Sequence, residues 1–168
     1  MAVAKTQWWQ VFGNAAQISS AAIALLGFGA VLLQLNEIRS NNRAASARQV
    51  YLAYMDLEFR FPELAVPDYD KIKSGDRETR IRYESFVSYL LYACEEALAA
   101  FGTQGEWRNS CGYDVKGHLT FLCEKMSEDP EFFSTFGTAT QDFVKSVMAN
   151  AGVASPNCNA KPGEGKLT

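Results

Sequence analysis

The chain has 168 residues, of which 48% are hydrophobic, and this length suits one soluble domain with a short additional segment. Its formal net charge of -3 argues against nucleic acid as a partner, because proteins that bind nucleic acid usually present a basic surface. The four cysteines are scattered and form no C-x-x-C pair, so we expect unpaired thiols rather than a disulfide framework.

The N-terminal part has a run of 31 residues without charge, between Lys5 and Glu37. Residues 15–36 are its most apolar part, and a helix of that length covers the hydrocarbon core of a bilayer, which is about 30 Å thick. The sequence therefore predicts a transmembrane helix at 15–36 after a short segment, 1–14. A buried helix of a soluble protein is the alternative reading.

The residues that flank this span predict how it lies in the membrane. Trp8 and Trp9 precede it, and tryptophan favours the membrane–water interface. One basic residue, Lys5, comes before the span, whereas Arg39, Arg43 and Arg48 follow it closely. Arg39 and Arg43 would lie at the membrane interface, near the lipid headgroups. The positive-inside rule then predicts a single-pass protein of the bacterial inner membrane with a cytoplasmic domain, where unpaired cysteines would stay reduced. A cleaved signal peptide is disfavoured because no small-x-small site closes the apolar run.

Residues 37–150 carry apolar side chains at spacings of three and four, which predicts helices and no strands. We expect one helix to continue from the span to Pro62, and the segment after it, to Gly75, to be a loop. Further helices are expected at 76–100 and 106–126, and from Asp129 onward. The composition of residues 151–168 predicts a disordered tail. The predicted fold is all-α: one transmembrane helix followed by a small helical bundle, with the aromatic side chains in its core.

One group of residues in the sequence is a candidate site for chemistry. Cys111, Asp114 and His118 fall on one helical face, which would allow a metal or thiol site. The alternative is core-facing cysteines beside a surface histidine. Glu95 and Glu96 could supply a carboxylate, although a solvated face is the simpler interpretation. Because no nucleophile elbow, phosphate-binding loop or dinucleotide fingerprint occurs, we predict no enzymatic activity and no cofactor.

Several sequence stretches together resemble a known group of proteins. They are an apolar span ending in QLNEIR, a PEL after the first soluble helix, and the aromatic-acidic stretch RYESFVSYLLYACEEALAAF. This order resembles the uncharacterised, membrane-anchored helical proteins of the DUF4760-like group. The resemblance implies the architecture and transfers no site residues.

The sequence thus predicts a membrane-tethered interaction protein, either an accessory subunit of a membrane complex or a signalling or defence component. Its partners would be the lipid bilayer and other membrane protein subunits, or further copies of itself. The alternatives are an oligomerising membrane effector and a small membrane-bound enzyme or metal-binding sensor.

Overall fold

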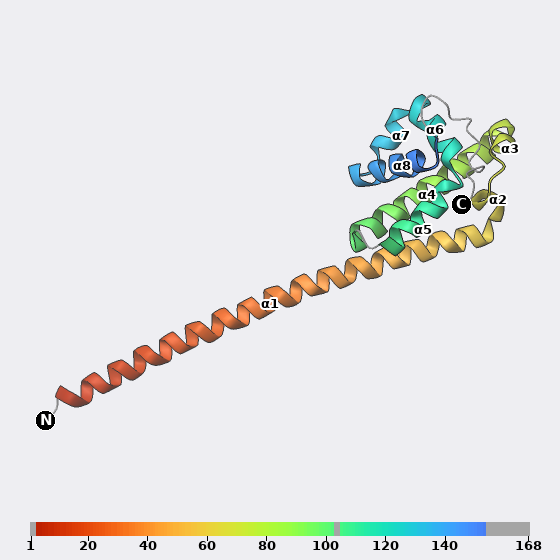
Figure 1. Cartoon of the computed structure of the whole chain (residues 1–168). Coiled ribbons are helices and arrows are strands. Elements are labelled where there is room, and N and C mark those ends of the chain that lie inside the picture. Colours follow the sequence, from red (N-terminus) through yellow and green to blue (C-terminus); the bar gives the residue numbers. More distant parts are fainter. Residues whose placement is uncertain (1–2, 103–104, 154–168) are drawn as a thin grey trace, which may run out of the picture. The chain divides into compact units, whose positions relative to one another are not determined.

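The computed structural model describes the backbone of residues 3–102 and 105–153, with side chains from Ala24 onward. All elements in these ranges are α-helices, and no strand occurs within them (Figure 1). The chain divides into two compact units, residues 1–42 and 43–168. The predicted all-α class and the helical bundle are confirmed for the described residues.

The first unit consists of the N-terminal part of helix α1, which runs from Val3 to Arg60 and crosses the boundary between the units. The helix ends one residue before the Phe61–Pro62 peptide, as predicted, because proline cannot continue a helix. Within the described residues, none of the helices has the length and apolar character needed to cross a membrane. Residues 15–23 of the expected span, together with Trp8 and Trp9, lie outside the residues whose side chains are described.

The second unit begins with the last part of α1 and continues through seven further helices that the structure describes. Two of these are short: α2, Pro62–Ala65, and α3, Tyr69–Ser74. The prediction of a loop here was wrong, because the same residues that break a helix can also start one. Pro62 occupies the first helical position of α2, and the Asp68 carboxylate accepts the Lys71 backbone N–H at the start of α3.

Helix α4, Arg77–Phe101, is the longest helix that lies wholly within the second unit. The Asp76 carboxylate accepts the Thr79 backbone N–H at 2.7 Å and caps its first turn. At the other end, Gly102 adopts a φ of 61° and donates its N–H to the Leu98 carbonyl. A positive φ favours glycine, which explains why the helix ends at this residue. Both ends agree with the prediction.

The expected helix at 106–126 is instead two helices, α5, Gly105–Lys116, and α6, Leu119–Glu128. The break falls at Gly117 and His118, where glycine lowers helix stability. The following segment is divided in the same way into α7, Pro130–Ser134, and α8, Thr138–Asn150. Asp129 caps α7 as predicted, since its carboxylate accepts the Phe132 backbone N–H. Both breaks turn the chain so that α4, α5 and α8 pack together.

The core of the second unit is built from the aromatic and aliphatic stripes of these helices, as predicted. Tyr51 and Tyr54 of α1 are buried against it, and the Tyr54 ring lies 5.6 Å from that of Phe86. Ile81 on α4, by contrast, is 51% exposed. Its side chain lies on the first turns of α4 at the edge of a surface cavity described below.

Candidate functional site

The predicted thiol residue Cys111 forms a disulfide with Cys94. The bond joins α5 to α4, their Cα atoms are 5.6 Å apart, and both cysteines are fully buried. Cys123 on α6 is not free either. The expectation of unpaired thiols was therefore wrong for the described cysteines. Separation along the sequence could not reveal the pair, because it forms only where α5 packs against α4.

His118 is buried in the core, with 1% exposure, so the alternative of a surface histidine was wrong. Its Nδ1 lies 2.8 Å from the hydroxyl oxygen of Tyr83, and its Nε2 is buried with no hydrogen-bond partner in the described structure. The Phe86 ring packs beside it, at 5.8 Å between centroids. Burial lowers the pKa of His118 to about 4, so the side chain is neutral at physiological pH.

Asp114, the third residue of the predicted face, points to a different neighbour. Its carboxylate accepts a hydrogen bond of 2.5 Å from the Tyr51 hydroxyl, and the neighbouring Tyr54 hydroxyl donates to Glu58 at 2.6 Å. Burial raises the pKa of Asp114, the Tyr51 hydrogen bond opposes this, and the charge of Glu58 raises it further. Tyr51 and Tyr54 of helix α1 therefore each donate to a carboxylate, and these two carboxylates lie beside each other.

These two carboxylates lie at a surface cavity of about 770 Å³ between the end of α1, α2, α5 and α8. Apolar groups line the same cavity, among them Val66 and Tyr113, and Asn150 of α8 completes one side. The sequence did not predict this site, because its residues come from four helices that are far apart along the chain. The only local signal was Asp114 itself.

A second cavity, of about 370 Å³, lies between α3, α4 and α6. Tyr69, Tyr83 and Phe121 line it with aromatic rings. At its rim Lys73 pairs with Glu124 at 2.8 Å, and Tyr69 donates to the same carboxylate at 2.8 Å. Burial raises the pKa of Glu124, but the hydrogen bonds from Lys73 and Tyr69 outweigh this and leave it below its usual value. The main role of the ion pair is to join α3 to α6.

Glu95 has a structural role that the sequence did not indicate. Its carboxylate accepts the backbone N–H of Gly137 at 3.1 Å and so caps α8 from the neighbouring helix α4. A Cβ atom on residue 137 would lie 2.9 Å from the carboxylate oxygen, which explains the glycine there. Glu96 is half-buried on the same helix. The interpretation of both residues as a solvated face was therefore incomplete.

The structure thus separates the candidates that the sequence placed on one face. Cys111 lies in a disulfide, His118 beside Tyr83 and Asp114 beside Tyr51. Among the described side chains, no group of three or more His, Cys, Asp or Glu residues could hold a metal ion. These contacts are those of a helical domain fixed by a disulfide and by paired polar groups.

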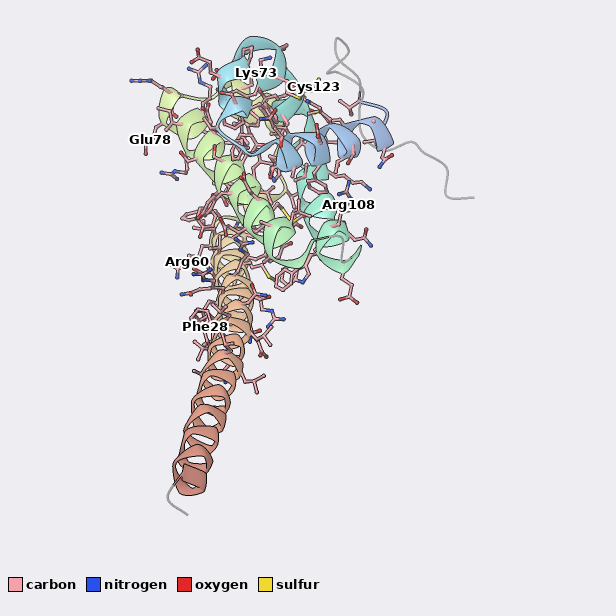
Figure 2. All side chains as sticks on the ribbon, turned by 90° about the vertical axis from the view of Figure 1, so that its left-hand side faces the viewer. Phe28, Arg60, Lys73, Glu78, Arg108 and Cys123 are labelled. Atoms are coloured by element: carbon pink, nitrogen blue, oxygen red, sulfur yellow. A yellow bond between two sulfur atoms is a disulfide. The ribbon has the colours of Figure 1, made fainter. Side chains whose placement is uncertain are left out.

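The described part of the first unit presents a different kind of candidate site. Its large apolar side chains are exposed on α1, and Phe28 (Figure 2) is one of them at 64%. Arg39 and Arg43, the predicted headgroup contacts, are exposed beyond this stretch. The exposed apolar residues are Leu25, Leu26, Phe28, Val31, Leu32, Leu33, Leu35 and Ile38.

The chain matches no protein-family model, and no curated protein or solved structure is similar enough to it to count as a relative. The resemblance to DUF4760-like proteins therefore stays a prediction. The fold and its local chemistry define the class of protein: it is an all-α protein with a disulfide-bonded helical domain.

Proposed function

We propose that the chain is a membrane-tethered interaction protein, anchored by residues 15–36 and acting through its helical domain as an accessory subunit of a membrane complex or a signalling or defence component. The observation that carries the proposal is the exposed apolar surface of α1 between Leu25 and Ile38. A contiguous apolar surface of this extent is normally covered by lipid or by another protein.

The distribution of these side chains around α1 favours lipid over a one-sided protein contact. Successive helical residues point about 100° apart, so Val31, Leu32 and Leu33 face three different directions. All three are exposed by about half or more. A helix that is apolar all round belongs in a membrane or a large core, whereas a helix that binds along one face shows an apolar stripe.

Within the second unit, α1 offers a surface for a protein partner. Leu52, Met55 and Phe59 follow one another at spacings of three and four and so share one helical face. They are exposed, with Phe59 at 88%, while Tyr51 and Tyr54 of the same helix are buried. Exposed aromatic and methionine side chains are enriched in the cores of protein interfaces. We assign the interaction function to this face.

The anchor is tested by placing a charge at the centre of the proposed span. An arginine there opposes membrane insertion by about 3 kcal/mol. We expect Leu26→Arg to shift the chain from the carbonate-resistant membrane pellet to the soluble or aggregated fraction. Tyr113→Arg is the control, because Tyr113 is similarly exposed but lies on α5, outside both the span and the partner face. Equal behaviour of the two variants would refute the anchor.

The interaction role is tested by purifying the full chain from membranes in mild detergent and identifying the proteins that accompany it. We expect a stoichiometric partner that Phe59→Asp removes and that Tyr113→Asp, an equally exposed change on α5, leaves in place. A purified chain that is alone or bound only to itself would overturn the accessory-subunit proposal and favour an oligomerising effector.

A further inference from the structure

From the buried disulfide between Cys94 and Cys111, we infer that the helical domain lies in an oxidising compartment. If residues 15–36 are the anchor proposed above, the N-terminus then faces the cytoplasm and the domain lies outside it. This reverses the orientation that the flanking charges predict.

The position of the disulfide makes it a structural bond. Both cysteines are fully buried, and the bond links α4 to α5, which are also joined by the stacked rings of Phe101 and Trp107, 4.6 Å apart. Neither sulfur is open to an exchange partner while the domain is folded, because thiol–disulfide exchange requires access to a sulfur atom. The bond must therefore form during folding, where an oxidant is present.

Its formation requires a supply of oxidising equivalents. The Cys94 and Cys111 thiols lose two protons and two electrons as the Sγ–Sγ bond forms, and a protein disulfide of an oxidase takes them up and becomes a dithiol. Bonds of this kind persist in secreted, periplasmic and lumenal proteins and are rare where glutathione and thioredoxin keep thiols reduced.

The charges that flank the span oppose this orientation only weakly. Of the three arginines that follow the span, Arg48 belongs to the fold, because its guanidinium lies 5.4 Å from the Phe101 ring centre. The contrast that remains is Lys5 against Arg39 and Arg43, a difference of one charge. Long domains also translocate largely regardless of the charges that flank the span.

The state of the bond is measured on the full chain in bacterial cells. Cells are quenched with acid, free thiols are alkylated, and the protein is digested with trypsin. Cleavage after Arg108 places Cys94 and Cys111 in separate peptides, 83–108 and 109–116. We expect the two peptides joined as the main form, separating only after reduction and absent in Cys94→Ser. Alkylated Cys94 and Cys111 as the main form would overturn the inference.

The side of the membrane is measured by labelling spheroplasts with a maleimide that does not cross membranes. We expect Glu78→Cys, on the exposed start of α4 (Figure 2), to react at once, and Thr6→Cys to react only after permeabilisation. The reverse pattern would overturn the inference. Carbonate extraction of the same cells tests the anchor separately. If carbonate releases the chain from the membrane while the Cys94 and Cys111 peptides remain joined, the anchor is refuted but the oxidising compartment is supported.

Discussion

The buried, neutral His118 predicts a specific loss of stability as the pH falls from 7 to 5. Its pKa is about 4 in the folded domain, against 6.5 for an unperturbed histidine, because burial opposes the charged form. The unfolded chain therefore binds more protons than the folded one between these values. The stability that neutral His118 contributes is complete above pH 6.5, falls as the pH drops toward 4, and is constant below that.

The magnitude follows from the two pKa values. Each pKa unit corresponds to about 1.4 kcal/mol, so the full effect is about 3 kcal/mol. At pH 5 the unfolded histidine is almost fully protonated and the folded one is mostly neutral, and we expect about 2 kcal/mol of the effect to be present there.

The assay compares wild type with His118→Gln, which can still hydrogen-bond Tyr83 but does not titrate. The free energy of unfolding is measured in urea at pH 7 and pH 5, with the full chain in mild detergent. Replacing Trp8 and Trp9 by phenylalanine leaves Trp107 as the fluorescent reporter inside the domain. Wild type should lose about 2 kcal/mol more than His118→Gln between the two pH values. The same pH dependence in both would refute the reasoning.

Three further changes test how the domain is held together, each by urea unfolding of the full chain. Cys94→Ser should lower the free energy of unfolding by about 3 kcal/mol, the chain-entropy value for a loop of 17 residues. Because this variant lacks the Cys94–Cys111 bond, reductant should have little further effect on its stability through the link between α4 and α5. Glu95→Gln removes the charged acceptor of the Gly137 N–H and should cost about 1 kcal/mol, whereas Glu96→Gln should cost little. Gly102→Ala forces a Cβ into a positive-φ conformation and should cost about 1 kcal/mol or more, and an unchanged stability would contradict the capping role.

The sequence predicted the elements whose signals are local. The start of α4 near Asp76, the stop before Pro62 and the Asp129–Pro130 start of α7 were all visible, because each is set by residues within one helical turn. The break at Gly117 was missed, because apolar residues continue at helical spacing through it and only packing shows that the chain turns there.

The candidate site could not be predicted to the same extent, because its contacts join residues far apart along the chain. Tyr51 and Asp114 are separated by 63 positions, and Glu95 and Gly137 by 42. Helical periodicity says that such residues share a face of their own helix. It does not say which face of another helix they meet, so neither the pairing of the two carboxylates at the cavity nor the cap of α8 could be predicted.

A change of pattern within α1 itself supports different surroundings for its two parts. From Ala47 through Tyr51 to Tyr54, the buried positions recur at four and three, and this one-sided stripe is what a helix packed on a protein core requires. Between Leu25 and Ile38 the exposed apolar residues are not confined to one narrow stripe, since Val31, Leu32 and Leu33 point about 100° apart. One continuous helix therefore carries a one-sided buried stripe in the second unit and a broader exposed apolar surface in the first. A single soluble environment would favour one stripe with a polar back throughout, so the change of pattern favours the anchor over a buried soluble helix.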